Sequence, residues 1–383
     1  MKLKEKKGEE GRRREKMRDD EYYIRLCLSL AKKGKGRTSP NPMVGAVVVK
    51  DDRIIGKGYH KKAGLPHAEA IAISKAGSDA EGATLYVSLE PCCHSNKKTP
   101  PCTKKIIESK IKKVVIGMID PNPLVSGKGI EELIASNIEV KMGVLEDEAK
   151  RLNESFIKYI KTKTPFVILK IAESLDGKIA TNTGESKWIT GEKAREYAHK
   201  LRDENDAVLV GIGTVLRDNP SLTTRLKNKK GKDPIRVVVD SSLRIGPSSK
   251  ILTQKSDART IIATSKTASK NKIEKIKKTG AEIILLKTKN GKIPLAQLMK
   301  ELGRREIISL MIEGGSEIAA SAIKEAVVDK VVFFIAPKII TGRNAKPSIG
   351  GEGIRKLKDA LMLKDVSVKR VGEDIMVEGY TYI

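Results

Sequence analysis

Apolar and polar positions alternate with two different periods along the first 160 residues. A helical period follows Asp19 and Asp20, either of which can cap a helix that ends near Gly34. The apolar face of this helix holds Tyr23, Leu26, Cys27 and Leu30. Two apolar runs, 43–50 and 53–59, flank a pair of aspartates and predict a β-hairpin. Strands and helices then alternate to residue 160, with a single helix expected over 146–160, and this order favours an α/β/α sandwich.

A second alternating series fills the rest of the chain. The polar stretch 161–165 separates it from the first, so we expect domains at 17–163 and 164–383. Apolar runs at 166–177, 206–216, 234–241, 260–265, 282–287, 306–315 and 330–340 predict strands, and helical periods lie between most of them. A hairpin is expected at the end of the chain. Residues 1–16 are basic and have no apolar run, which predicts a disordered tail.

Composition narrows the class of ligand. Charged residues make up 32% of the chain and the formal net charge is +27, which favours anionic partners. Aromatic residues make up only 3%, and the lysines are scattered, so we expect small anionic ligands and no nucleic acid. No apolar run reaches the roughly 18 residues that cross a bilayer, and four cysteines in 383 residues are too few for a disulfide framework. We therefore expect a cytoplasmic protein with no membrane partner.

A candidate metal site is formed by His67, Cys92 and Cys102. Each cysteine follows a proline at an expected helix start, where the helix dipole would lower the pKa of the thiol. Catalytic zinc takes three protein ligands and leaves one position open. Glu69, two residues after the histidine, would stay off the metal and carry protons, and H-x-E followed by P-C is the signature of zinc-dependent deaminases. The alternative is a closed structural site with Cys93 or His94 as a fourth ligand.

The second domain contains two glycine-rich stretches. The stretch 211–216 fails as a dinucleotide fingerprint because its third glycine is replaced by Leu216. The turn of Glu313, Gly314 and Gly315 lies between an apolar strand and a helix, where backbone N–H groups can approach a phosphate. A plain strand-to-helix turn explains these glycines equally well when they are considered alone.

At this point the sequence resembles a known family, the bifunctional riboflavin-biosynthesis deaminase/reductases. The family pattern E-P-C-x-H-x-G-x-T-P-P-C matches Glu90, Pro91, Cys92, His94, Thr99, Pro100, Pro101 and Cys102. The stretches 39–51 and 120–130 resemble its other deaminase motifs, and 164–383 resembles its reductase half in motif order. The loop between the cysteines is one residue longer than the pattern, and residues 96–98 stand where the pattern has a glycine. This difference affects how the loop contacts the substrate.

The resemblance implies a fold, two cofactors and a set of contacts. It implies a cytidine-deaminase-like domain with Zn²⁺, a dihydrofolate-reductase-like domain with NADPH, and a phosphorylated pyrimidine as substrate. The positions that it assigns to NADPH are Ala172, Trp188, Thr214, Asp218, Ser241 and Gly315. Those that it assigns to the substrate are Asn41, His94, Ser186, Arg202, Leu222, Arg225 and Glu313. Simpler interpretations remain for Asn41 as a turn residue, Arg202 as a solvated charge and Trp188 as a core residue.

Two rival functions are a tRNA or nucleotide deaminase fused to an unrelated domain, and a non-catalytic zinc-stabilised RNA-binding module. The ten-residue step from Cys92 to Cys102 argues against the first rival, because nucleic-acid and cytidine deaminases use P-C-x-x-C. A metal ion that keeps an exchangeable water would indicate an enzyme and would argue against the second rival, the RNA-binding module. A homo-oligomer is compatible with all of these interpretations.

Overall fold

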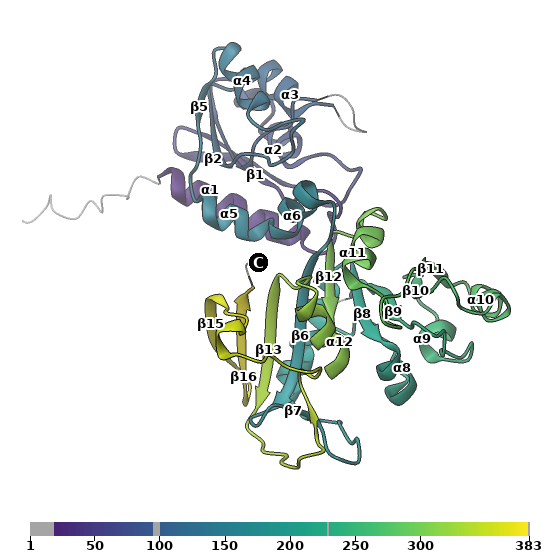
Figure 1. Ribbon diagram of the computed structural model, residues 1–383. Helices are drawn as coiled ribbons and strands as arrows, with labels where there is room; N and C mark the ends of the chain where they lie inside the picture. The colour runs from purple at the N-terminus through teal and green to yellow at the C-terminus, as the bar shows by residue number, and fades with distance from the viewer. Residues whose placement is uncertain (1–18, 95–99, 228–229, 382–383) are drawn as a thin grey trace, which may run out of the picture. The chain divides into compact units, whose positions relative to one another are not determined.

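The computed structural model describes residues 19–94, 100–227 and 230–381, which form two compact units (Figure 1). The first unit holds residues up to Lys35 together with Met43–Asn153, and the second holds Gly36–Pro42 together with Glu154–Ile383. The expected disordered tail, 1–16, and the inserted residues 96–98 lie outside the described residues. Within the described ranges, no helix is long and apolar enough to cross a membrane.

The first unit is built on a mixed five-stranded sheet. Its strands are β1 (Gly45–Lys50), β2 (Arg53–Tyr59), β3 (Thr84–Leu89), β4 (Lys113–Met118) and β5 (Glu139–Lys141), in the order β2-β1-β3-β4-β5. The β1–β2 hairpin turns at Asp51 and Asp52, whose φ values of 48° and 57° match the left-handed turn that suits a twisted hairpin. Strands β3, β4 and β5 are parallel, so the loops that follow β3 and β4 emerge at the same edge of the sheet.

Helices cover both faces of this sheet, which confirms the expected α/β/α layers (Figure 1). They are α1 (Asp20–Ala31), α2 (Ala68–Ala76), α3 (Cys102–Glu108), α4 (Lys128–Ala135) and α5 (Glu146–Leu152), with short 3-10 turns at Lys32–Gly34 and Gly77–Ala80. Asp19 caps α1 by accepting the N–H of Tyr22. The buried face of α1 is Tyr23, Ile24, Cys27, Leu28 and Ala31, so Cys27 is a core residue as expected, whereas Leu26 and Leu30 lie at its margin.

The single helix expected over 146–160 is wrong. The chain forms α5 and then α6 (Glu154–Thr162), and Asn153 separates them. The side chain of Asn153 is buried: it accepts the N–H of Met43 at 2.8 Å and donates to the carbonyl of the same residue at 3.0 Å. An asparagine that binds another backbone segment in this way competes with helix continuation. The helix therefore ends here, at the last residue of the first unit.

The second unit has a nine-stranded sheet in the order β11-β10-β9-β8-β12-β6-β13-β16-β15. The strands are β6 (Phe166–Ser174), β8 (Ala207–Gly211), β9 (Ile235–Val239), β10 (Thr260–Ser265), β11 (Glu282–Leu286), β12 (Ser309–Ile312), β13 (Lys330–Ala336), β15 (Lys364–Val371) and β16 (Asp374–Tyr380). The seven from β11 to β13 are parallel, and the expected final hairpin, β15–β16, joins antiparallel to β13. A small ladder pairs β7 (Lys178–Ala180) with β14 (Lys346–Pro347).

Two apolar cores lie on opposite faces of this sheet. One packs α11 (Leu295–Gly303) and α12 (Ser316–Lys324) against β6, and the other packs α7 (Glu192–Glu204), α8 (Ile212–Asp218), α9 (Lys250–Thr253) and α10 (Lys270–Lys277). A 3-10 turn, Leu357–Asp359, precedes β15. The expected strand over 206–216 ends at Gly211, because the chain turns there into α8. A parallel sheet covered on both faces places the loops at its carboxyl edge in the position typical of ligand sites.

The segment Gly36–Pro42 is bound to the second unit by buried acids. Arg37 Nη2 lies 2.7 Å from Asp203 Oδ1, and the Ser39 hydroxyl donates to Asp206 Oδ2 at 2.8 Å. Asp203 and Asp206 are both less than 10% exposed. The segment thus leaves the first unit after Lys35 and returns to it at Met43.

Candidate functional site

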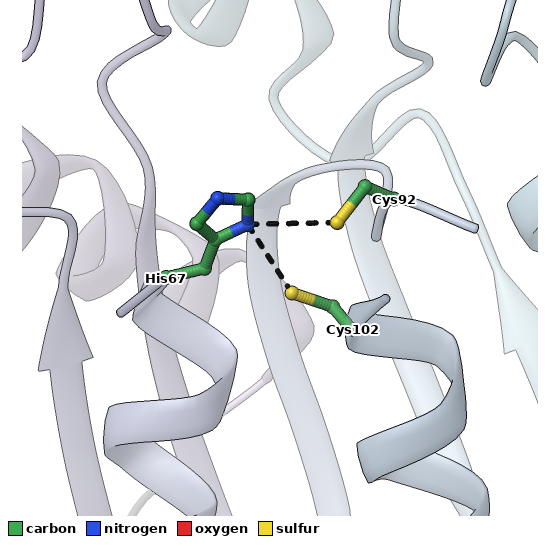
Figure 2. Close-up of side chains that lie close together, drawn as sticks. All are labelled: His67, Cys92 and Cys102. Atoms are coloured by element: carbon green, nitrogen blue, oxygen red, sulfur yellow. Dashed lines mark hydrogen bonds between the residues drawn. The ribbon is translucent and has the colours of Figure 1, made fainter. Parts of the chain in front are cut away.

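The three expected metal ligands lie together at the edge of the first sheet. His67 is the N-cap of α2, Cys102 is the first residue of α3, and Cys92 lies in the loop after β3 (Figure 2). The Nδ1 atom of His67 is 3.5 Å from Cys92 Sγ and 3.3 Å from Cys102 Sγ. All three donor atoms lie within 4.8 Å of one another, and the two thiols are buried.

The donor atoms fit a tetrahedral zinc ion. With zinc–nitrogen and zinc–sulfur bonds of about 2.0 and 2.3 Å, a tetrahedral arrangement separates nitrogen from sulfur by about 3.5 Å. The two separations of 3.5 and 3.3 Å agree with that value. One imidazole and two thiolates are also ligands that zinc prefers. The site therefore suits zinc in both chemistry and spacing.

The surroundings of the two cysteines differ from those expected. Cys102 begins a helix, but Cys92 does not: residues 91–94 are not helical, so the expectation of a helix dipole at Cys92 is wrong. Among the described residues, the metal-ligand cluster contains neither Cys93 nor His94. The Cys93 thiol instead faces the carbonyl of Leu124 at 3.9 Å.

Glu69 occupies the first turn of α2 beside the ligand histidine. It is 3% exposed, and its Oε2 has no hydrogen-bond partner among the described residues. Burial raises the pKa of Glu69, and the nearby Cys92 thiol acts in the same direction. The close approach of α2 to β2 depends on Gly58, where a Cβ atom would lie 2.3 Å from the Ala68 carbonyl oxygen. A buried carboxyl group with an unused oxygen beside a metal site is suited to proton transfer.

Most of the residues assigned to NADPH lie at the carboxyl edge of the second sheet. Ala172 is near the end of β6, Ser241 follows β9, and Gly315 follows β12 as the N-cap of α12. Thr214, in the first turn of α8, approaches Gly315: a Cβ atom on that glycine would lie 3.8 Å from its hydroxyl oxygen. Asp218 is the last residue of α8, so it lies at the end of this helix that is farther along the chain from β8.

Trp188 is not a core residue, because 63% of it is exposed. It lies in the loop after β7, and the guanidinium carbon of Arg195 lies 4.7 Å from its ring centroid. Lys338, in the loop after β13, donates to the Trp188 carbonyl oxygen at 2.9 Å. A cation over one ring face and a second cation on the carbonyl hold this exposed indole in place.

Three residues assigned to the substrate, Arg202, Arg225 and Glu313, are brought together. The Arg202 Nε donates to Glu313 Oε2 at 2.8 Å, so Arg202 is a partly buried ion-pair partner and not a solvated charge. Arg202 Nη1 also donates to the Thr223 carbonyl at 3.0 Å. The exposed Arg225 donates its backbone N–H to His199 Nδ1 at 3.3 Å. These residues form a cationic cluster with one partly buried carboxylate.

The remaining assigned positions have less distinctive surroundings. The side chain of Leu222 is 4% exposed and belongs to the core, so a substrate contact there would involve its backbone. Asn41 lies in a turn, where its N–H donates to the Thr38 carbonyl at 2.8 Å, within the segment that packs with the second unit. Ser186 is half-buried in the loop after β7, and His94 lies in the non-helical stretch after Cys92.

Two residues of this cluster were missed by sequence reasoning. Lys170 lies on β6 and its Nζ is 3.2 Å from Glu313 Oε1. His199, on α7, has its pKa lowered to about 4 by burial and by the charges of Arg202 and Arg225. A signal for Lys170 was present, since a lysine in the apolar strand 166–174 is unusual without a partner. Nothing in the local sequence distinguishes His199.

The comparisons with known proteins agree with this geometry. Residues 17–118 match the cytidine and deoxycytidylate deaminase zinc-binding region, and residues 165–377 match the RibD C-terminal domain. These two matches define a zinc deaminase joined to a reductase domain, which excludes a deaminase fused to an unrelated partner.

Relatives of the whole chain identify the family. The riboflavin biosynthesis protein RibD of Aquifex aeolicus is 49% identical, covering 94% of this chain and 97% of the relative, and that of Escherichia coli is 38% identical, covering 93% and 98%. Solved structures that are similar include Acinetobacter baumannii RibD (TM-score 0.86, 36% identity, covering 95% and 99%). A Thermotoga maritima diaminohydroxyphosphoribosylaminopyrimidine deaminase/5-amino-6-(5-phosphoribosylamino)uracil reductase has a TM-score of 0.83 at 41% identity, with the same coverage. The chain belongs to the RibD family of riboflavin biosynthesis proteins.

Proposed function

We propose that the chain carries out two consecutive steps on one phosphorylated pyrimidine, with the residue roles given below. The first is hydrolytic deamination of 2,5-diamino-6-(5-phosphoribosylamino)pyrimidin-4-one. The second is reduction of the ribosyl group by NADPH, which gives 5-amino-6-(5-phosphoribitylamino)uracil. The observation that carries the proposal is the cluster of His67, Cys92 and Cys102 beside a buried Glu69.

In the first step, His67, Cys92 and Cys102 hold the metal and Glu69 moves protons. Zinc, when bound, supplies Lewis acidity that makes water a nucleophile near neutral pH. Glu69 would take a proton from the attacking water and deliver it toward the leaving ammonia, from a buried position beside the ligand histidine. The two thiols and Glu69 are buried, so these groups have little contact with bulk solvent.

In the second step, the residues around Glu313 bind and orient the substrate. Lys170 and Arg202 surround one carboxylate, so the cluster keeps a net positive charge that attracts an anionic substrate. The exposed guanidinium of Arg225 is placed to bind the phosphate. The backbone N–H groups at Gly315, the start of α12, suit the anionic part of NADPH, and Trp188 offers a flat face to one of its rings. The cofactor supplies the hydride, and the chain supplies orientation.

We further propose that the protein works in the cytoplasm, without nucleic acid or membrane as partner. Four cysteines in 383 residues are too few for a disulfide framework, which is compatible with a reducing compartment. A homo-oligomer remains compatible with the long exposed edge strand β15, which holds Val366 and Val368 at 53% and 66% exposure.

The test is mass spectrometry of the pyrimidine product formed by the zinc-loaded full chain. Without NADPH, the product should gain about one mass unit, because an amino group is replaced by oxygen. With NADPH, the product should gain two more hydrogen atoms in the sugar. Release of ammonia without any reduced product in the presence of NADPH would leave the reductase proposal without support. Absence of both products would contradict the proposal as a whole.

A further inference from the structure

Among the residues that the structure describes, the hydrogen-bond partners of the buried Glu90 carboxylate are all backbone N–H groups next to the metal-binding loop. Glu90 follows β3, is 2% exposed, and accepts four hydrogen bonds. Its Oε2 accepts from Asp120 at 3.1 Å and Gly127 at 3.0 Å, and its Oε1 accepts from Gly129 at 3.1 Å and Ile130 at 3.4 Å. All four donors come from the segment between β4 and the first turn of α4.

This arrangement makes Glu90 a cap for α4 that is supplied from a distant part of the chain. Gly127 is the N-cap residue of α4. A glycine has no side chain that could accept hydrogen bonds from the first N–H groups of the helix. These N–H groups have no partner inside the helix, and a negative charge is favourable at that end. The fit requires Gly129, where a Cβ atom would lie 2.2 Å from the Pro91 carbonyl oxygen and 3.2 Å from Glu90 Oε1.

The segment that Glu90 anchors also contacts the metal ligands. Val125, 1% exposed, packs with Cys92 and Cys102 in a small apolar cluster. The two ligand cysteines are joined directly as well, because the Cys102 N–H donates to the Cys92 carbonyl at 2.9 Å. A continuous path therefore runs from the Glu90 carboxylate through the 120–130 segment to the apolar wall behind both thiols.

We propose that Glu90 is a positioning residue for the metal centre, and that it acts through Val125 and the Cys92 loop. The inference rests on the proposed ligand set, His67, Cys92 and Cys102, and goes beyond it by assigning a role to the residue that precedes Pro91. Glutamine cannot replace Glu90, because its NH₂ group would face backbone N–H groups that need an acceptor. Partners outside the ligand set that fix ligand geometry commonly change metal affinity by about 10–100-fold when they are mutated.

The experiment compares Glu90→Gln with the matched control Glu131→Gln, an exposed carboxylate in the first turn of α4. Full-length proteins are loaded with Co²⁺, and the visible spectrum reports thiolate coordination and tetrahedral geometry. Zinc affinity is measured by competition with a chromogenic chelator. We expect Glu90→Gln to bind zinc about 10–100-fold more weakly with an altered cobalt spectrum, and Glu131→Gln to match the parent chain. A folded Glu90→Gln protein with the parent affinity and spectrum would overturn the inference.

A second variant decides the question if Glu90→Gln does not fold, which far-UV circular dichroism would reveal. Val125→Ala keeps all four hydrogen bonds to Glu90 and removes only the contact with the thiols. We expect it to weaken zinc binding and to shift the cobalt spectrum in the same direction, and parent-like behaviour would overturn the inference. An incorrect ligand set would give a different result from an incorrect role for Glu90. If the ligand set is wrong, the parent chain will lack thiolate-to-cobalt absorption, or His67→Ala will leave the parent spectrum unchanged.

Discussion

Arg202 and Glu313 form a largely buried ion pair in which the guanidinium Nε donates to Oε2 at 2.8 Å, with both side chains less than 20% exposed. Lys170 binds the other carboxylate oxygen at 3.2 Å. Burial alone would raise the pKa of Glu313, but the charges of Arg202 and Lys170 outweigh it and lower that pKa to about 2. The carboxylate thus stays charged at neutral pH and holds two cations at the carboxyl edge of the sheet, where an anionic substrate can meet them.

We expect Glu313→Gln to destabilise the second unit by about 3 kcal/mol, because it leaves two partly buried cations without their counter-charge. Trp188 is the single tryptophan of the chain and lies in the second unit, so urea unfolding followed by its emission reports this unit alone. The matched control is Glu317→Gln, an exposed carboxylate in the first turn of α12, which should change stability by less than about 0.5 kcal/mol. Equal midpoints for the two variants would show that the ion pair contributes little.

Glu69→Gln should abolish deamination and leave the metal in place. The amide keeps the shape of the side chain but cannot carry a proton, and loss of general acid–base catalysis costs about 10²–10⁴-fold. Ammonia release measures the rate, and metal analysis measures zinc content. Reduction of a pre-deaminated substrate by the same variant should remain at the parent rate. Near-normal ammonia release would remove Glu69 from the mechanism.

The cysteines should divide into ligands and a bystander. Cys92→Ser and Cys102→Ser should each lose zinc and deamination, because a hydroxyl group is a poor substitute for a thiolate ligand. Cys93→Ser is the internal control: its thiol lies 3.9 Å from a backbone carbonyl and outside the donor cluster, so both zinc and activity should persist. Loss of zinc in the Cys93 variant would show that the ligand set is wrong.

The second unit should lose stability on acidification in two stages. The folded-state pKa of His199, about 4, is below its usual 6.5, so the unfolded chain binds a proton more readily between these values and stability falls as the pH drops from 6.5 to 4. The lowered pKa of Glu313 adds a loss between pH 4.5 and 2. His199 is the only histidine of the second unit, so His199→Gln should flatten the first stage and keep the second. The check is Trp188-monitored unfolding from pH 7 to 3; an unchanged slope above pH 4.5 would contradict the assignment.

Binding of NADPH should quench Trp188 and sensitise emission from the dihydronicotinamide. The indole is 63% exposed and held by Arg195 and Lys338, so a planar ligand can reach it without rearrangement of the core. Arg225→Ala should leave this titration unchanged and weaken the phosphorylated pyrimidine by about 1.5–3 kcal/mol, the usual contribution of a charge-assisted hydrogen bond. Trp188 emission that does not respond to saturating NADPH would contradict the placement of the cofactor.

The sequence predicted those parts of the structure that depend on local pattern. Apolar periodicity located both α/β units, and the H-x-E and P-C spacings located a donor cluster that the fold assembles from α2, α3 and the loop after β3. The fold class and the two activities are confirmed by the family to which the chain belongs.

Interactions between distant segments could not be predicted in the same way. Lys170 meets Glu313 across 143 positions, and Glu90 finds its donors 30 to 40 residues later. The end of the helix at Asn153 likewise depends on Met43, 110 positions earlier. A pattern within one window of sequence carries no information on such partners, because each residue type fits its local element equally well without them.

The passage of Gly36–Pro42 through the second unit bears on how the two activities could be divided between genes. The backbone changes unit after Lys35, after Pro42 and again after Asn153, so no single cut separates one complete unit from the other. A reductase gene that began at residue 164 would lose α6 and would leave Asp203 and Asp206 without Arg37 and Ser39. Both acids would keep backbone partners, because Asp203 Oδ1 accepts the Lys232 N–H and Asp206 Oδ2 accepts the N–H groups of Ile308 and Ser309. Division of the gene at residue 164 would therefore cost the second unit one ion pair and one hydrogen bond, and Asp203 and Asp206 are the positions at which we expect compensating substitutions.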